Sequence, residues 1–180
     1  MSKKVLIISS SPRKSGNSEM LADAFAKGAR EAGHQVDTVY LRQANYSFCK
    51  GCMACHKLGH CVIQDDAREI ATQMHDAQVI VFASPVYYYS ISGQLKTMLD
   101  RANPLYDSDY AFTQVYFLTS AAENEPSTPE GAIKAIQGWV DCFDRCQFVD
   151  TIFAGGVTEP GDIQGHPALE KTYEAGKSLT

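Results

Sequence analysis

Five apolar stretches along the chain are separated by segments in which apolar residues recur every three or four positions. Apolar runs without alternation, such as Val5–Ile8, are typical of strands that are buried on both faces of a parallel sheet. Segments with a three-to-four-residue period are typical of helices with one buried face. The pattern predicts strands at residues 3–11, 35–42, 77–87, 113–121 and 147–157. It predicts helices at 18–33, 66–74, 93–102, 128–143 and 167–179.

Several residues suggest where these helices begin. Ser92 is placed to cap the helix at 93–102, and the span Asp66–Glu69 resembles a capping box. We expect Pro129 and Pro167 at the first position of their helices, where the missing amide hydrogen has no intrahelical partner to lose.

The alternation of strands and helices predicts the fold class, an α/β protein with helices on both faces of a parallel sheet. No internal repeat or low-complexity linker interrupts the chain, so we expect one doubly wound domain over residues 1–180. Five strands favour the flavodoxin-like order 2-1-3-4-5. In that order the ligand crevice lies at the carboxyl ends of the first and third strands.

Composition narrows the class of protein further. The chain has 180 residues, 44% of them hydrophobic, which is enough for one domain with a sizeable core. Its net charge of -5 argues against a nucleic-acid partner. We find no apolar run long enough for a signal peptide or a membrane span, and therefore expect no membrane partner and a cytoplasmic, reducing location.

The segment SSSPRKSGNS, residues 9–18, follows the first strand and opens the first helix. Free amides and the positive dipole end at a helix N-terminus favour an anion. Hydroxyl groups, the Asn17 amide and the Arg13 charge can add hydrogen bonds. The alternative is a turn that only caps the helix. The residues expected to bind a cofactor here are Ser9, Ser11, Arg13, Ser15, Gly16, Asn17 and Ser18.

Several kinds of phosphate site are excluded by what this segment lacks. It contains neither G-x-x-x-x-G-K-[ST] nor G-x-G-x-x-G, so it is not a nucleoside-triphosphate loop or a dinucleotide fingerprint. Residues 7–18 contain no cysteine, which excludes a cysteine-dependent phosphatase. What remains, if the loop binds a phosphate, is a site that holds the phosphate without attacking it.

The third strand ends in SPVYYYSISG, residues 84–93, where three tyrosines follow each other. Aromatic faces at the crevice can stack on a flat ring, although such residues can equally pack the core or a subunit contact. The residues expected along the ligand are Pro85, Val86, Tyr87 and Tyr88, with Tyr87 the favoured one. After the fourth strand, Ser120 opens a long polar loop that can form a third wall. A phosphate loop, an aromatic wall and a polar loop on one rim fit flavin mononucleotide, FMN, in size and charge.

At this point the sequence resembles the flavodoxin-like family of NAD(P)H-dependent FMN reductases. The segments that show the resemblance are SSPRKSGNS at 10–18, SPVYYYSISGQLKTMLDR at 84–101 and the cysteine-rich loop ending in CVIQDD at 61–66. The resemblance implies that Ser11, Arg13, Asn17 and Ser18 hold the FMN phosphate while residues 85–88 lie along the isoalloxazine ring. It also implies a homodimer or homotetramer. Asp100 and Arg101 match a pair that often ends this helix in the family, and structurally we interpret them as a surface ion pair.

The mechanism implied by the resemblance is ping-pong hydride transfer from NAD(P)H through FMN to a quinone, azo, iron or protein acceptor. The flavin carries that chemistry, so no catalytic residue is assigned. Two further functions stay open: an FMN-binding electron carrier that does not itself oxidise nicotinamide, and a flavin-free module that senses metal or oxidant.

The loop at 47–64 contains cysteines spaced Cys49-x2-Cys52-x2-Cys55-x5-Cys61. Four thiolates this close can hold a [4Fe-4S] cluster, whereas structural zinc usually takes two separated ligand pairs. The spacing resembles that of the iron–sulfur flavoproteins. The alternative is a set of structural or oxidation-sensitive thiols. Because the loop follows the second strand, we expect it on the flavin's rim, within reach of a flavin in its own or a neighbouring subunit. Cys142 and Cys146 are expected as buried packing on the fourth long helix.

Overall fold

A five-stranded parallel sheet forms the centre of the molecule in the computed structural model, which describes all residues 1–180. The strands are β1 (Lys4–Ser9), β2 (Gln35–Tyr40), β3 (Val79–Pro85), β4 (Gln114–Ser120) and β5 (Gln147–Ala154). Their order is β2-β1-β3-β4-β5, and every neighbouring pair is parallel. The predicted strand order and fold class are confirmed.

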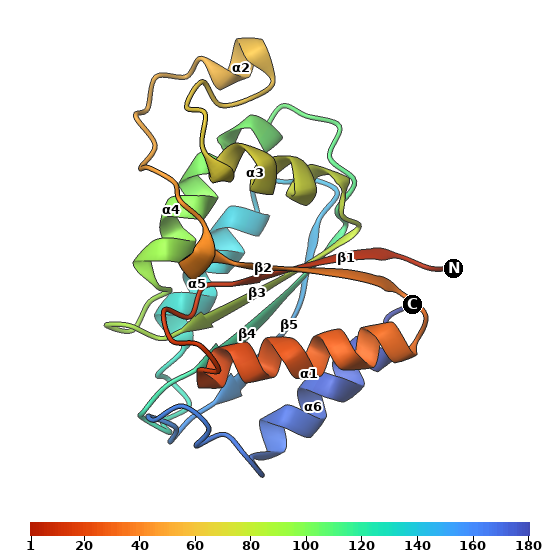
Figure 1. The fold of residues 1–180 in the computed structure, drawn as a ribbon, viewed down its shortest axis with the longest axis vertical. Coiled ribbons are helices and arrows are strands. Elements are labelled where there is room, and N and C mark those ends of the chain that lie inside the picture. The colour runs from red at the N-terminus through yellow and green to blue at the C-terminus, as the bar shows by residue number, and fades with distance from the viewer.

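Helices cover both faces of this sheet. They are α1 (Asn17–Glu31), α2 (Cys55–Leu58), α3 (Asp66–Asp76), α4 (Gly93–Arg101), α5 (Glu130–Val140) and α6 (Pro167–Lys177), with 3-10 turns at Leu41–Gln43 and Asn103–Leu105. Figure 1 shows α1 and α6 on one face and α3, α4 and α5 on the other. The short α2, inside the cysteine-rich loop, was not predicted. None of the helices combines the length and the apolar character that a membrane crossing requires.

Successive residues of β1 point to opposite faces and enter two separate cores. Leu6 and Ile8 pack with residues of α3, α4 and α5, whereas Val5 and Ile7 pack with α1 and α6. This two-sided burial explains why the central strands are apolar throughout, without the polar alternation of a one-sided sheet.

The helices α1 and α6 touch through their backbones. A Cβ atom added at Gly28 would lie 2.1 Å from the carbonyl oxygen of Tyr173, and one added at Gly176 would lie 2.2 Å from that of Phe25. Only glycine permits so close an approach at these two positions.

The helix ends agree with the sequence in part. The Ser92 hydroxyl accepts a hydrogen bond from the Leu95 amide, and Pro167 is the first residue of α6, as predicted. Pro129 was predicted wrongly, because it precedes α5 and Glu130 is the first helical residue. The capping box at Asp66–Glu69 is also wrong. Asp66 already lies inside α3, and the capping position belongs to Asp65.

The prediction of buried packing for the cysteines near the end of α5 is wrong for Cys142 and confirmed in part for Cys146, which packs against the core. The helix ends at Val140, and the chain then turns so that Phe143 enters the core. Cys142 is therefore exposed after the helix, and Cys146 is only half-buried.

Candidate functional site

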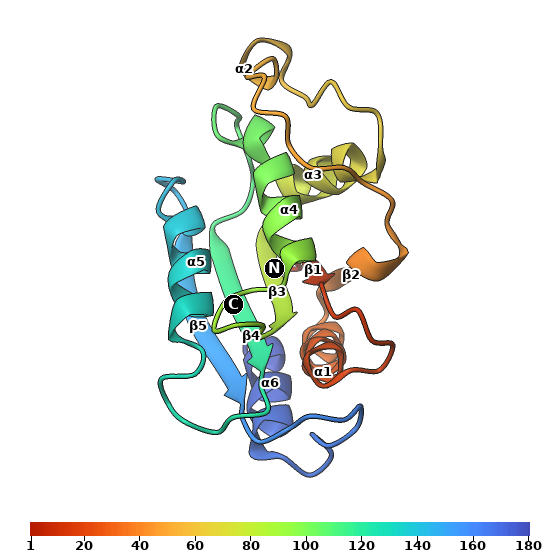
Figure 2. The same cartoon turned by 90° about the vertical axis from the view of Figure 1, so that its left-hand side faces the viewer.

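A crevice with a volume of about 250 Å³ opens where the parallel strands end. Figure 2 shows the arrowheads of β4 and β5 pointing to this end of the molecule. The crevice is lined by residues from the loops after β1, β3, β4 and β5. Nine of the predicted cofactor-binding residues line it together: Ser11, Arg13, Gly16, Asn17, Ser18, Pro85, Val86, Tyr87 and Ser120.

The loop after β1 forms a cradle at the start of α1. Gly16 is the capping residue of that helix, and no side chain caps the amides of the first turn. A Cβ atom at Gly16 would lie 2.5 Å from the Ser11 hydroxyl oxygen, so any larger residue would fill the cradle. Uncapped amides at the positive end of a helix dipole are suited to a phosphate group. The cradle therefore fits the FMN phosphate.

A fourth wall comes from the segment after β5, which the sequence analysis missed. Arg13 donates from Nη1 to the Thr158 carbonyl at 2.9 Å, and Asn17 donates from Nδ2 to the Glu159 carbonyl at 3.0 Å. The Asn17 Oδ1 also accepts a hydrogen bond from the Ile163 amide at 3.3 Å. Arg13 and Asn17 thus tie this segment to the phosphate loop. The sequence signal that could have indicated this segment was Gly155-Gly156, because two glycines in a row end β5 earlier than the predicted strand.

Ser9 and Ser15 do not line the crevice. Ser9 is fully buried at the end of β1, and its hydroxyl has no hydrogen-bond partner. Ser15 has a left-handed backbone with φ of 55°, and its amide donates to Glu19 Oε1 at 3.1 Å. That amide is therefore already used within the protein.

The three tyrosines form a tight turn whose residues point in different directions. Tyr87 and Ser90 pair as an antiparallel bridge, and Tyr88 and Tyr89 between them have φ of 48° and 60°. Two left-handed central residues define the type I′ turn. Tyr87 lies at the crevice, whereas Tyr88 is fully exposed and lines a neighbouring hollow instead. A Cβ atom at Gly131 of α5 would lie 2.2 Å from the Tyr89 carbonyl oxygen, so α5 supports the turn closely.

Buried serines connect the phosphate loop to the tyrosine turn. Ser92 donates from Oγ to Ser10 Oγ at 2.8 Å, and its amide donates to Ser84 Oγ at 3.0 Å. Ser10 donates in turn to the Ala83 carbonyl at 3.1 Å. Because all these groups are shielded from water, losing one partner would leave another unsatisfied. The network holds the two main walls of the crevice in one relative position.

The cysteine-rich loop forms a separate cavity. Cys49, Cys52, Cys55 and Cys61 all line it, and all are free thiols. No group of three or more metal-ligating side chains converges there as the chain stands. The donor set nevertheless suits a cluster. The Gly51 amide donates to Cys49 Sγ at 3.4 Å, and Asn103 donates to Cys55 Sγ at 3.2 Å. Such N–H···S bonds stabilise cluster thiolates.

Arg101 closes the base of this loop, and its prediction as a surface residue was wrong. The residue is 1% exposed, and its two terminal nitrogens donate to the Asp65 carboxylate at 2.8 and 2.7 Å. It also donates to the Ser47 carbonyl at 2.7 Å, while its Nε has no partner. The hydrogen bonds from Arg101 lower the pKa of Asp65 below its usual value. Asp100 pairs instead with Lys96 at 2.6 Å.

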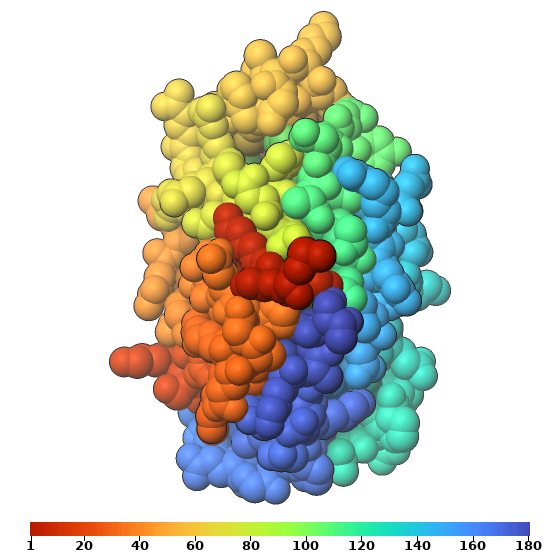
Figure 3. Space-filling model, turned by 90° about the vertical axis from the view of Figure 1, so that its right-hand side faces the viewer, coloured from red at the N-terminus to blue at the C-terminus, as the bar shows by residue number.

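The cysteine cavity and the crevice lie at opposite ends of α4. Asp100 and Arg101, at the end of α4, line the cysteine cavity, whereas the tyrosine turn precedes its first residue, Gly93. Nine helical residues span roughly 13 Å. Figures 1 and 3 show the loop projecting at the far end of the molecule. The prediction that the cysteine-rich loop lies on the flavin's rim within one chain is therefore wrong, because the loop extends away from that rim along α4.

Several known proteins are similar to this chain in sequence or in fold. The family model for NADPH-dependent FMN reductase matches residues 3–151. An iron-sulfur flavoprotein of Methanosarcina thermophila is 33% identical over 98% of this chain and 93% of its own length. An iron-sulfur flavoprotein of Methanocaldococcus jannaschii is 38% identical over 57% of this chain and 53% of its own length.

A solved structure, the NAD(P)H:quinone oxidoreductase from Methanothermobacter marburgensis, superposes with a TM-score of 0.76 at 21% identity, covering all of both chains. This likeness shows the flavodoxin-like fold. The family match extends over most of the chain and includes the phosphate loop, the cysteine-rich loop and the tyrosine turn. The chain therefore belongs to the NADPH-dependent FMN reductase family, as its motifs predicted.

Proposed function

We propose that the chain is an FMN-dependent oxidoreductase that takes electrons from NADH or NADPH and delivers them to a small-molecule or protein acceptor. The observation that carries the proposal is the crevice, in which the uncapped start of α1, Tyr87 and Ser120 line one space. Membership of the reductase family supports it. When bound, FMN supplies the chemistry that accepts a hydride and passes electrons on.

The protein's own residues bind and orient the cofactor. The amides at the start of α1 and the Ser18 hydroxyl hold the phosphate, with Gly16 leaving the room for it. Arg13 keeps the segment after β5 in place through Thr158 and adds positive charge beside the phosphate. Pro85, Val86 and Tyr87 lie along the ring, with Tyr87 as the aromatic contact.

Titration of the FMN-free chain with FMN, followed by flavin fluorescence, tests the binding step. We expect saturation at one FMN per chain and, with bound FMN, oxidation of NADH or NADPH in the presence of a quinone. Bound FMN without nicotinamide oxidation would support the electron carrier instead, whose docking to a basic partner the net charge of -5 favours. A chain that takes up no FMN would refute both and support the metal- or oxidant-sensing module.

We also propose that Cys49, Cys52, Cys55 and Cys61 hold a [4Fe-4S] cluster. Their common cavity, the N–H···S bonds and the relatives named iron-sulfur flavoprotein support this assignment. Protein purified without oxygen should contain about four irons per chain. Cys52→Ala should lose the iron and keep FMN, whereas the matched control Cys142→Ala, in an exposed turn, should keep both. Iron-free protein after expression with added iron and sulfide would contradict the assignment.

The homodimer or homotetramer stays a prediction. Phe48 and Met53 on the cysteine-rich loop and Tyr88 on the tyrosine turn are exposed, and a second subunit that covers them would bury apolar surface. Light scattering of the eluting protein measures the subunit number directly, and a monomer would contradict the prediction.

A further inference from the structure

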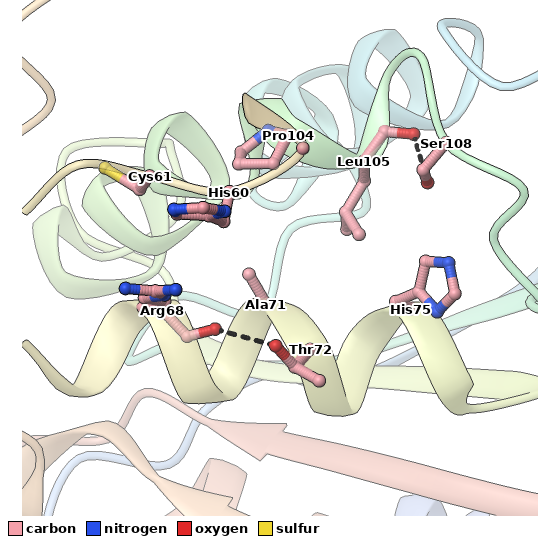
Figure 4. A pocket seen from close by; sticks show the side chains of 10 residues that line it. His60, Cys61, Arg68, Ala71, Thr72, His75, Pro104, Leu105 and Ser108 are labelled. Atoms are coloured by element: carbon pink, nitrogen blue, oxygen red, sulfur yellow. Dashed lines mark hydrogen bonds between the residues drawn. The ribbon is translucent and has the colours of Figure 1, made fainter. Parts of the chain in front are cut away.

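A second cavity, with a volume of about 210 Å³, lies between the end of the cysteine-rich loop and α3. Figure 4 shows it from close by. It shares no residue with the FMN crevice, and it meets the cysteine cavity at Cys61 and Pro104, which line both. The residues that matter for its chemistry are His60, Arg68, Ala71, Thr72, His75 and Leu105.

One end of this cavity offers hydrogen-bond donors that the protein does not use. The Arg68 guanidinium, from α3, lies beside the His60 ring, from the cysteine-rich loop (Figure 4). The Arg68 guanidinium takes part in no salt bridge and no hydrogen bond within the chain; it is the backbone carbonyl of Arg68 that accepts from the Thr72 hydroxyl at 3.1 Å. A guanidinium presents parallel N–H groups that match the two oxygens of a carboxylate.

The middle of the cavity is apolar and of a definite size. Ala71 and Leu105 are both buried, and they line the cavity from opposite sides between the two polar ends (Figure 4). An apolar protein cavity of about 150 Å³ accommodates benzene. A space of about 210 Å³ therefore suits one aromatic ring with one small substituent.

The other end of the cavity offers no free hydrogen-bond donor from His75. His75 is hydrogen-bonded to Asp76 at 2.8 Å and to Asp109 at 2.9 Å. These hydrogen bonds raise the pKa of His75, with Asp76 the larger contribution. Both ring nitrogens of His75 are therefore already paired with carboxylates. The unused donors of the cavity lie at the Arg68 end.

We propose that this cavity binds a single-ring aromatic carboxylate, with its carboxylate on Arg68 and His60 and its ring between Ala71 and Leu105. The Arg68 end provides the paired donors, Ala71 and Leu105 provide the apolar surfaces, and the His75 end has no free ring nitrogen to compete for the carboxylate. The bound ring would lie against the Cys61 segment, on the opposite side of it from the cysteine cavity.

Calorimetric titration of the full chain with benzoate tests this assignment. FMN is present at saturation, so that the crevice is unavailable, and the titration is repeated without FMN. We expect one benzoate per chain in both conditions, which separates this result from the outcome of the FMN proposal. Arg68→Gln should weaken benzoate binding at least tenfold, and Thr72→Phe, which fills the space, should abolish it. The matched control Lys57→Gln removes an exposed cation of α2 outside the cavity and should change the affinity less than twofold.

Three further probes distinguish the ligand class. Benzyl alcohol lacks the carboxylate, inorganic phosphate lacks the ring, and terephthalate would place a second carboxylate near Asp76 and Asp109. Each should bind at least tenfold more weakly than benzoate. Phosphate binding as tightly as benzoate would show a simple anion site and overturn the proposal. Unchanged benzoate affinity in Arg68→Gln, or no benzoate binding by the wild-type chain, would overturn it as well.

Discussion

Replacing Arg101 by methionine should strongly destabilise the attachment of the cysteine-rich loop. The Arg101 side chain is fully buried, and its carboxylate partner Asp65 has a side chain only 13% exposed. Removing one partner of a buried ion pair costs about 3–5 kcal/mol, because the other charge stays behind without compensation. Asp65 keeps one hydrogen bond from the Ser47 amide at 2.9 Å. We therefore expect a loss near the lower value, about 3 kcal/mol.

That loss is large beside the 5–15 kcal/mol stability of a typical domain. Urea unfolding followed by circular dichroism measures the global part. Because residues 47–64 can open while the sheet stays folded, native-state alkylation of the half-buried Cys61 measures the local part. In the Arg101→Met variant, thiol alkylation should become about a hundredfold faster. Each 1.4 kcal/mol lost from the opening free energy corresponds to a tenfold faster reaction, and the expected loss is about 3 kcal/mol.

The double variant Asp65→Asn, Arg101→Met provides the control. Removing both charges leaves no uncompensated carboxylate, so the double variant should be more stable than Arg101→Met alone. The reasoning is refuted if Arg101→Met loses less than about 1 kcal/mol and its Cys61 reacts no faster than that of the wild-type chain.

Three further predictions concern the same regions. Gly16→Ala places a Cβ against Ser11 Oγ and should raise the FMN dissociation constant at least tenfold in a fluorescence titration; unchanged affinity would contradict the cradle. Ser92→Ala removes a helix cap and a buried hydrogen bond and should cost about 1–3 kcal/mol in urea unfolding, with a loss below 0.5 kcal/mol as the contrary result. Because the folded pKa of Asp65 is lowered, its stabilising contribution is complete above the ordinary value of 3.8 and is lost as the pH falls through the folded pKa. The stability difference between wild-type and Asp65→Asn should shrink below that pH, and a constant difference would argue against it.

The strand positions were predictable because each strand has its own local pattern, and their order followed from the arrangement that five-stranded doubly wound sheets favour. The apolar run at β1 and the helical spacing after it require no knowledge of distant residues. The burial of Arg101 has no such local signal, since a cation at a helix end usually faces water. What buries it is Asp65 and the Ser47 carbonyl, which lie 36 and 54 positions away in the sequence.

The candidate site was predictable to a similar extent. Loops that follow consecutive parallel strands must meet at one edge, so the phosphate loop, Tyr87 and Ser120 could be placed together. The directions of individual side chains could not. Tyr88 turns outward because the turn requires a left-handed backbone there, and the Ser15 amide is taken by Glu19. The segment after β5 joins the site through contacts that span 145 and 142 positions, beyond any local pattern.

The glycine contact between α1 and α6 has a consequence for the cofactor. The matched family region ends at residue 151, before α6 begins at Pro167. Yet Gly176 and Gly28 lock the two helices so that α1 has no freedom to slide along its axis. Gly28 lies 11 positions from Asn17, about 16 Å along the helix. The C-terminal helix α6 thus fixes the axial position of α1, and with it the position of the first amides of α1 relative to a bound anion. A methyl group at Gly176 would push α1 away and displace those amides at the other end of α1.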